Sequence, residues 1–199
     1  MCNEAGGWQD QIAASFGGLN RIDFDENGFR VNPIIISKER KTKLNDNLML
    51  FFTGYTRFSA DIQKSTTATL EEKKKQLDQM LALVDEAQDI LENKDRDIDD
   101  FGRLLDKTWK LKRDSGKEIT TDSIDDFYNR GIKAGALGGK LLGAGGGGFL
   151  LFYVQKEFQE QVRNALSDLM QVPFKFEDNG TRVIYYSPEA FDKETSVEK

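Results

Sequence analysis

The chain has 199 residues, of which 38% are hydrophobic and 31% charged, and its formal net charge is −6 at pH 7. This length allows one domain with a substantial core, or one domain and part of another. The negative charge argues against nucleic acid as the main partner, because neutralising phosphates requires a basic face. No apolar stretch approaches the length of a membrane span, so a membrane is not an expected partner either.

Histidine is absent from the sequence, and there is one cysteine, Cys2. The absence of histidine excludes Ser-His-Asp and Cys-His nucleophilic machinery and histidine-based zinc sites. Any chemistry must therefore rest on carboxylates, Lys, Arg, hydroxyls, backbone amides and an oxygen-ligated metal such as Mg²⁺. A single cysteine cannot form an internal disulfide, so we expect a protein of the reducing cytoplasm.

The N-terminal residues predict one short helix and two extended segments. Residues 8–15 form the helix, which Gly17-Gly18 closes, and residues 19–24 alternate as a strand. The segment FRVNPIIIS is a second extended piece, and its Pro33 suits the edge of a sheet. The charged stretch between Ser37 and Asn47 then predicts a boundary between this N-terminal piece and the rest of the chain.

The middle of the chain predicts a buried strand and three helices. The near-continuous apolar run over residues 48–52 is typical of a buried strand. A helix is predicted from residue 59 to about residue 93, where apolar residues recur at helical spacing. Those apolar residues are Leu77, Leu81, Val84, Ala87 and Leu91. A second helix covers residues 98–112, and a third follows Thr121 or Asp122, either of which suits an N-cap.

The C-terminal part predicts a strand, a helix and a hairpin. Residues 149–154 form the strand and residues 156–170 the helix. The segments VPFKFE and TRVIYYS predict two further strands, joined at the turn Asp178-Asn179-Gly180. Strands, helices, a strand, a helix and two strands, in that order, favour an α+β fold over a doubly wound α/β sheet.

Glycine is concentrated directly before the strand at residue 149, where Gly143 and Gly145 to Gly148 surround Ala144. Relative to alanine, five glycines cost about 2–5 kcal/mol of stability through unfolded-state entropy. This segment therefore indicates a backbone position that needs positive φ, or a close approach to the main chain. It is either a loop whose N–H groups face a phosphate or a tight crossover between helix and strand. It is not a Walker A loop, because no Lys-Ser/Thr pair follows, and the dinucleotide fingerprint follows a strand rather than preceding one.

Long segments of the sequence resemble a known family of kinases. GALGGKLLGAGGGGFLLFYV is similar to the third motif of the GHMP kinases, named for galactokinase and the homoserine, mevalonate and phosphomevalonate kinases. GGWQDQIAASFGGLNRIDF, FFTGYTRFSADIQ and the stretch from WKLKRDSG through the glycines resemble the D-glycero-D-manno-heptose 7-phosphate kinase branch. The resemblance runs from Asn3 to about Pro188 in family order.

The resemblance implies a fold and an activity. Residues 47–190 correspond to the GHMP kinase C-terminal domain, a ferredoxin-like αβ sandwich, residues 1–46 to a remnant of the N-terminal lobe, and residues 191–199 to a frayed tail. Family members use ATP and Mg²⁺ to phosphorylate a hydroxyl of a small metabolite. Here this would be O1 of a sugar phosphate such as heptose 7-phosphate, on the route to nucleotide-activated heptose.

The glycine- and serine-rich loop of the family's N-terminal lobe has no match in this sequence. The resemblance therefore implies that the chain corresponds to the C-terminal portion of a longer kinase. It also implies that the carboxylate that holds Mg²⁺ lies elsewhere, and no metal ligand is assigned here. We expect the chain alone to bind ATP poorly and to transfer no phosphate.

Asp10 is the residue that the resemblance implies is catalytic. It stands in WQDQ, where the family places an aspartate that accepts or orients the proton of the substrate hydroxyl. From the residues alone, a surface or helix-capping aspartate is the alternative. Gln11, Gly17 and Gly18 would shape the sugar pocket beside Asp10. We expect Asp10 and the glycine loop to converge on one cleft.

Three further groups would face the substrate by resemblance. The turn after the buried strand contains Thr53, Gly54, Thr56 and Arg57, and Arg57 either clamps a phosphate or makes a structural ion pair. Lys112 and Arg113 are candidates for the sugar 7-phosphate or are ordinary helix-surface charges. The phosphate-proximal loop comprises Gly143, Ala144, Gly145, Gly146, Gly147 and Gly148. Asp106 departs from the family pattern, because many relatives are expected to have histidine there.

Other functions remain open at this point. The chain is alternatively a non-catalytic phosphosugar-binding module, or a GHMP kinase for another alcohol such as fucose, galactose or mevalonate. A third alternative is a structural piece whose glycines serve only packing. In every enzymatic case the expected partners are ATP and a small sugar or sugar phosphate, and the oligomeric state is not predicted.

Overall fold

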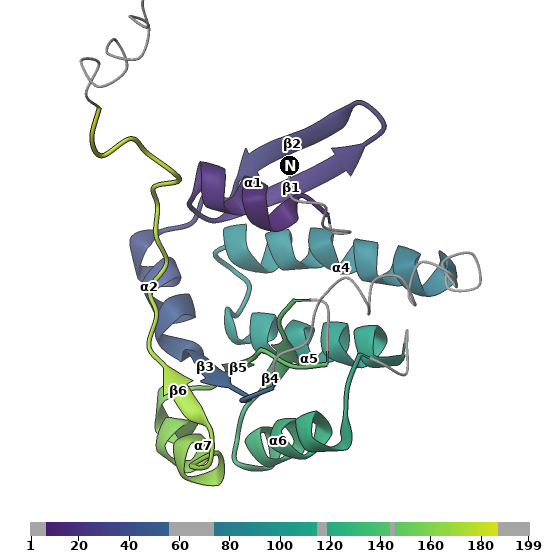
Figure 1. Ribbon diagram of the computed structural model, residues 1–199, viewed down its shortest axis with the longest axis vertical. Helices are drawn as coiled ribbons and strands as arrows, with labels where there is room; N and C mark the ends of the chain where they lie inside the picture. The colour runs from purple at the N-terminus through teal and green to yellow at the C-terminus, as the bar shows by residue number, and fades with distance from the viewer. Residues whose placement is uncertain (1–6, 56–73, 115–118, 144–145, 187–199) are drawn as a thin grey trace, which may run out of the picture.

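The computed structural model of the chain describes residues 7–55, 74–114, 119–143 and 146–186 (Figure 1). These residues form helices and two antiparallel sheets, which is the predicted α+β class. In chain order the elements are α1 (Gln9–Phe16), β1 (Asn20–Asp25), β2 (Gly28–Pro33), α2 (Lys38–Asn47), β3 (Leu48–Phe52), α4 (Lys74–Glu92), α5 (Asp99–Asp114), α6 (Asp122–Lys133), β4 (Gly138–Leu141), β5 (Phe149–Tyr153), η1 (Lys156–Phe158), α7 (Gln159–Ala165) and β6 (Met170–Val172).

The larger sheet has the strand order β4-β5-β3-β6 and carries helices on both sides. Successive side chains of a strand point to opposite faces. A Cβ at Gly131 of α6 would lie 2.6 Å from the Phe152 ring, and a Cβ at Gly102 of α5 would lie 2.7 Å from the Tyr153 ring. Helices α5 and α6 therefore pack against opposite faces of β5, and Figure 1 shows the strands between α4 and α5 on one side and α6 and α7 on the other.

The core divides into clusters on either side of this sheet. The largest cluster contains Met49, Phe51, Trp109, Ile119, Ile124, Tyr128, Ala136, Leu141, Leu150, Phe152, Val154, Val162 and Leu166. A smaller cluster contains Leu44, Leu91, Ile98, Leu105 and Tyr153. Burying one such side chain fully contributes about 1.5–3 kcal/mol, so these two clusters hold the helices on the sheet.

The charged segment predicted as a boundary folds as the helix α2. Its N-cap is Ser37, whose hydroxyl oxygen accepts a hydrogen bond from the backbone N–H of Arg40. The Arg40 guanidinium donates to three carbonyl oxygens at and after the end of α4, those of Ile90, Leu91 and Arg96. A cation at this position also interacts favourably with the negative, C-terminal end of the α4 dipole. Helix α2 is thus bound to the C-terminal part of the fold, and the division of the chain at residue 46 stays a prediction.

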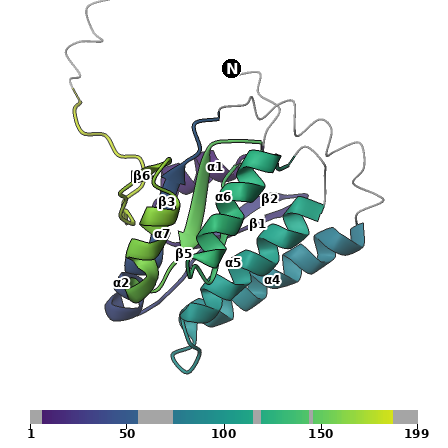
Figure 2. The same ribbon diagram turned by 90° about the horizontal axis from the view of Figure 1, so that it is seen from below.

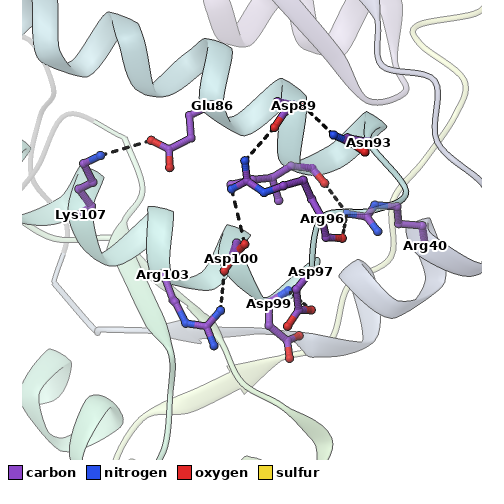
Figure 3. A network of polar contacts seen from close by, with 11 residues as sticks. Arg40, Glu86, Asp89, Asn93, Arg96, Asp97, Asp99, Asp100, Arg103 and Lys107 are labelled. Carbon is purple, nitrogen blue, oxygen red and sulfur yellow. Dashed lines mark hydrogen bonds and ion pairs between the residues drawn. The ribbon is translucent and has the colours of Figure 1, made fainter.

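A network of ion pairs joins α4 to α5 beside this contact (Figure 3). Arg96 lies 2.8 Å from Asp89 and 3.5 Å from Asp100, and Lys107 lies 3.3 Å from Glu86. These side chains are partly exposed, and ion pairs of this kind typically contribute less than about 1 kcal/mol each. The network therefore links α4 to α5 but contributes little to the free energy of folding.

Several predicted elements are confirmed. The strand over residues 48–52 is β3, and the helix over residues 98–112 is α5. Helix α6 begins after Thr121, whose hydroxyl accepts the N–H of Ile124 as an N-cap. The helix predicted from residue 59 agrees with α4 from residue 74 onward, and its earlier part lies outside the described residues. Figure 2 shows α4, α5 and α6 from below, running side by side.

The buried side of α4 agrees with the predicted one only in its C-terminal half. Leu91 is buried and Ala87 packs against a core cluster, as predicted. Leu77, Leu81 and Val84 are exposed, however, and Leu83 and Ile90 are buried. These two residues pack with Leu104 of α5 in one cluster. The contact with α5 therefore buries Leu83 and Ile90 and leaves Leu77, Leu81 and Val84 exposed.

The C-terminal part departs most from prediction. The predicted helix over residues 156–170 is shorter, because η1 is followed by α7, which ends at Ala165, and Met170 already begins β6. Strand β6 pairs antiparallel with β3. The predicted hairpin around Asp178-Asn179-Gly180 is wrong, since among the described residues neither VPFKFE nor the part of TRVIYYS up to residue 186 pairs with the other.

Residues 173–181, which we call the C-terminal strap, run past α2 to the end of α1 instead. The N–H of Phe176 donates to Asn45 Oδ1, 2.9 Å away, and Lys41 pairs with Asp178. The N–H of Thr181 donates to the carbonyl oxygen of Ala14, 3.0 Å away. These contacts with distant helices replace the local pairing that the turn chemistry predicted.

Strand β4 was not predicted, because glycine is unfavourable inside strands. It pairs antiparallel with β5, and Gly138 lies opposite Tyr153. A Cβ at Gly138 would lie 2.0 Å from the carbonyl oxygen of Gly102. Glycine is therefore required here because the backbones of α5 and β4 touch.

Candidate functional site

Helix α5 and strand β4 run side by side in the same direction toward the glycine loop. Gly138 contacts Gly102 at one end, and at the other end Lys112 Nζ donates to the carbonyl oxygen of Gly143, 2.5 Å away. Ten residues of helix and five of strand both span about 15–17 Å, so the two contacts are consistent with parallel packing. The close backbone contact thus places Lys112 at the entry of the loop.

The glycine loop requires glycine for both reasons predicted from the sequence. Gly143, Gly146 and Gly148 have positive φ values of 78°, 73° and 101°. A Cβ at Gly147 would lie 2.5 Å from the carbonyl oxygen of Tyr55. Ala144 and Gly145 lie outside the described residues.

The turn after β3 is bound directly to this loop. The backbone N–H and the hydroxyl of Thr53 both donate to the carbonyl oxygen of Gly148 at 2.9 Å, and the N–H of Gly148 donates to Tyr55 at 2.8 Å. The N–H of Gly146 donates to the carbonyl oxygen of Ile119 at 3.0 Å. Two loop amides are therefore engaged within the chain. The structure brings Thr53 to the loop, and Gly54 follows it with φ of 76°. Thr56 and Arg57 lie outside the described residues.

Two lysines lie beside the loop. Strand β4 alternates, so Lys140 points to the same face as Gly138, which is the face covered by α5. Burial, together with repulsion from Lys140, lowers the pKa of Lys112 from 10.5 to about 8. Burial also lowers the pKa of Lys140. The site therefore concentrates positive charge in a poorly solvated place.

Lys140 was missed from the sequence, and Arg113 has a different setting from Lys112. The only sequence signal for Lys140 is a charged residue inside the glycine-rich and apolar run GGKLLG. Arg113 lies 3.5 Å from Asp125 of α6, and Asp125 also accepts from Thr120 at 2.9 Å. Of the predicted pair, Lys112 thus contacts the glycine loop, whereas Arg113 contacts α6.

Asp106 joins the same two helices. Its carboxylate accepts a hydrogen bond of 2.5 Å from the Tyr128 hydroxyl and pairs with Lys110 at 2.7 Å. Burial and this carboxylate raise the pKa of Tyr128. Asp106, which departs from the expected family pattern, therefore links α5 to α6 in this protein.

Helix α1 carries Asp10 and Gln11, and both are exposed. Asp10 lies in the first turn, after the N-cap Trp8, and Ile12 is the buried residue of the helix. The side chain of Asp10 makes no hydrogen bond or ion pair with another residue in the described part of the chain. Its convergence with the glycine loop stays a prediction.

Gly17 and Gly18 contact the C-terminal strap. A Cβ at Gly17, where φ is 64°, would lie 2.2 Å from the backbone carbon of Asn179. The N–H of Gly18 donates to the carbonyl oxygen of Glu177 at 2.9 Å. Both glycines also line a groove of about 610 Å³ between α1, the β1–β2 hairpin and α2. They therefore border a pocket, and they also hold the strap.

Within the described ranges, no group of three or more acidic or cysteine side chains lies close enough together to hold a metal ion. The helices in these ranges are all too short or too polar to span a membrane.

The sheet, its helices and the glycine loop together have the architecture of the C-terminal domain of GHMP kinases. Residues 71–171 match the family described as GHMP kinases C terminal, and the chain belongs to this family. Over 151 residues the chain is 35% identical to D-glycero-alpha-D-manno-heptose 7-phosphate kinase of Campylobacter jejuni, covering 75% of this chain and 44% of that protein.

Two more relatives extend this comparison. L-fucokinase/L-fucose-1-P guanylyltransferase of Bacteroides fragilis is 32% identical over 172 residues, covering 82% of this chain and 18% of that protein. The crystal structure of L. major mevalonate kinase in complex with R-mevalonate superposes with a TM-score of 0.65 at 18% identity, covering 81% of this chain and 50% of that chain. This last likeness shows the fold alone. The chain spans half or less of the length of each of these relatives.

Proposed function

We propose that the chain forms the substrate side of an ATP-dependent sugar-phosphate kinase, with O1 of heptose 7-phosphate as the acceptor. The observation that carries this proposal is the glycine loop, which is bonded to the turn after β3 and bordered by Lys112. The 35% identity to a heptose 7-phosphate kinase supports the choice of sugar.

Phosphoryl transfer depends mainly on positioning and charge neutralisation. The loop supplies a backbone surface without side chains, so a phosphate group can approach it closely. The lysine supplies positive charge that is poorly screened because the site is partly buried. Together they would hold a phosphate next to the acceptor, as a kinase of this family requires.

Asp10 would accept or orient the proton of the acceptor hydroxyl. Carboxylates are weak bases toward alcohols, but an anomeric hydroxyl is more acidic than most. The proton also needs to move only as the bond to phosphorus forms. Exposure of Asp10 on α1 leaves its carboxylate accessible to a ligand. Gln11, Gly17 and Gly18 would shape the sugar pocket beside it.

The remaining assignments complete the proposal. Thr53 and Gly54 would form the floor of the site, and Thr56 and Arg57 would contact the substrate. Lys112 and Arg113 would lie toward the sugar 7-phosphate. ATP and a sugar phosphate are the proposed small-molecule partners, and we place the enzyme in the cytoplasm. Mg²⁺ would be held by residues other than those described here, so no step is assigned to it.

The test is ATP-dependent phosphorylation of heptose 7-phosphate, followed by ³¹P NMR. We expect no turnover with the chain alone. Turnover is expected when the chain is joined to the part of the Campylobacter jejuni relative that it does not cover. In that joined enzyme, Asp10→Asn should lower kcat about 10²–10⁴-fold with little change in KM. Activity within a few-fold of the unchanged enzyme would assign the proton transfer to another residue.

The same assay separates the alternatives. Turnover of fucose but not of heptose 7-phosphate would favour a fucokinase, which the Bacteroides fragilis relative supports. Calorimetry that detects heptose 7-phosphate binding, without turnover in any joined enzyme, would favour a non-catalytic phosphosugar-binding module. If Gly146→Ala and Gly147→Ala change stability but not ligand affinity, the loop serves packing alone.

A further inference from the structure

We propose that the C-terminal strap positions α1, and with it Asp10, relative to the sheet that carries the glycine loop, and that Gly180 is the positioning residue of this contact. The inference rests on the proposed function, because it concerns the helix whose aspartate would accept or orient the proton of the acceptor hydroxyl. It gives a role to a glycine that the sequence indicated only as part of a turn.

The strap begins at the strand that meets the glycine loop. Strand β6 pairs antiparallel with β3, so that Val172 lies opposite Leu50. Strand β3 leads directly to Thr53, whose N–H and hydroxyl both donate to the carbonyl oxygen of Gly148. The strap follows β6 at residue 173, so its first end is fixed to the same strand as the loop.

The middle of the strap is held on α2. The Phe176 side chain packs against the smaller core cluster, and its N–H donates to Asn45 Oδ1 at 2.9 Å. Lys41 pairs with Asp178. Every second residue over 172–177 is partly buried, as expected for an extended segment with one face against the protein. Figure 1 shows this segment passing α2 on its way to α1.

The far end of the strap holds the C-terminal end of α1. The N–H and the hydroxyl of Thr181 both donate to the carbonyl oxygen of Ala14, at 3.0 and 3.2 Å. The N–H of Gly18 donates to the carbonyl oxygen of Glu177 at 2.9 Å. Within the described ranges, residues 9–18 make no other hydrogen bond to a segment that is distant in the sequence. The strap is therefore the hydrogen-bonded connection between α1 and the larger sheet.

A ring contact also joins α1 to the β1–β2 hairpin, but it does not reach the larger sheet. Phe16 meets Phe29 edge to face, with the ring centroids 6.2 Å apart. The two side chains are 54% and 42% exposed, so this contact excludes little water. It therefore leaves the strap as the element that relates α1 to the glycine loop.

Gly180 makes the closest contact between the strap and α1. A Cβ at Gly180 would lie 1.9 Å from the carbonyl oxygen of Ser15 and 2.6 Å from the carbonyl carbon of Phe16. Both obstructing groups are backbone, and carbon and oxygen normally approach no closer than about 3.3 Å, so α1 must move away by about 1.4 Å. Gly180 has no positive φ, so alanine fits its backbone conformation and the substitution acts through this contact alone.

A displacement of this size matters for phosphoryl transfer, which depends mainly on positioning. Asp10 lies on the same short helix as Ser15, so a shift of the helix moves its carboxylate as well. Misplacing a reacting group by about 1 Å can lower a rate about 10²-fold. The strap should therefore affect kcat far more than the binding of ATP.

The first experiment measures amide hydrogen exchange of α1 in the chain alone, so it needs no turnover. We expect Gly180→Ala to speed this exchange about 10–100-fold, because it disrupts the hydrogen bonds at Ala14 and Gly18. Thr181→Val, which removes only the hydroxyl bond, should speed it about 2–10-fold.

Gly28→Ala is the matched control for exchange. It adds the same methyl group at a positive φ of 130°, which is unfavourable for alanine, but nothing lies within 4 Å of the new Cβ. Exchange in α1 should stay as in the unchanged chain. If α1 exchanges no faster in Gly180→Ala, folded by circular dichroism, than in Gly28→Ala, the strap does not hold the helix.

The second experiment uses the joined enzyme. Gly180→Ala should lower kcat about 10–100-fold with little change in the KM for ATP, whereas Gly28→Ala should leave kcat unchanged. In the Asp10→Asn background, Gly180→Ala should have little further effect, because it acts through that carboxylate. An equal loss of kcat in both backgrounds would show a general structural role and overturn the proposal.

The two experiments separate this inference from the proposed function. A joined enzyme without kinase activity would refute the proposed function, while faster exchange of α1 in Gly180→Ala would still show that the strap holds the helix. A joined enzyme that is active and loses kcat in Asp10→Asn but not in Gly180→Ala would refute the positioning role alone.

Discussion

Replacing Gly138 with alanine tests whether the contact between α5 and β4 positions the candidate site. The new Cβ would lie 2.0 Å from the carbonyl oxygen of Gly102 and 2.8 Å from the backbone N–H of Asp106. Carbon and oxygen atoms normally approach no closer than about 3.3 Å, so α5 and β4 must separate by about 1.3 Å. A gap of that size forfeits much of the dispersion energy along the contact. Both obstructing groups are backbone, so no side chain can rotate to relieve the overlap.

We expect Gly138→Ala to lower the free energy of unfolding by about 2–4 kcal/mol, from overpacking and lost contacts. Urea denaturation followed by circular dichroism measures this change. The same shift moves Lys112 relative to the loop, so phosphate affinity should also fall in the variant that remains folded.

Gly143→Ala is the matched control, because nothing lies within 4 Å of its Cβ and only its positive φ of 78° is unfavourable. This substitution should cost about 1–2 kcal/mol. A loss below about 1 kcal/mol in Gly138→Ala, or a loss no greater than in Gly143→Ala, would refute the close-contact explanation for the glycines of β4.

Two predictions concern pH. Sulfate, whose charge is constant in this range, should bind more weakly as pH rises through about 8, because Lys112 loses its proton there. The free energy of unfolding should rise as the pH increases above about 8, because the unfolded chain keeps this lysine protonated up to about 10.5. An affinity that is flat between about pH 6.5 and 9.5 would contradict this. Burial raises the pKa of Asp99, but hydrogen bonds from Tyr153 and Gln155, with the charge of Lys43, outweigh it and lower that pKa overall. The stabilisation from Asp99 should therefore be present above about pH 4 and be lost in more acidic solution, and urea denaturation should show a smaller acid loss in Asp99→Asn than in the unchanged chain.

The predicted site residues differ in whether their signals are local in the sequence. The glycine loop is visible because several glycines in a row are locally unfavourable and need a reason. Lys112 was a candidate because the segment WKLKRDSG resembles a segment of the kinase family. Lys140 was not, because its importance depends on a helix that is distant in the sequence and packs beside β4 through two glycines.

Elements with local signals were predictable from the sequence: β3 from its apolar run, α5 from its helical spacing, and the start of α6 from the two candidate N-caps Thr121 and Asp122, of which Thr121 is the cap. Three features depend on contacts between distant segments and were not predictable: strand β4, the course of the C-terminal strap and the neighbours of Gly17. In each of these cases a contact between distant backbones outweighs the local preference. The segment around Asp178-Asn179-Gly180 forms no hairpin, and its flanking residues are hydrogen-bonded to the end of α1 instead, from Thr181 to Ala14 and from Gly18 to Glu177.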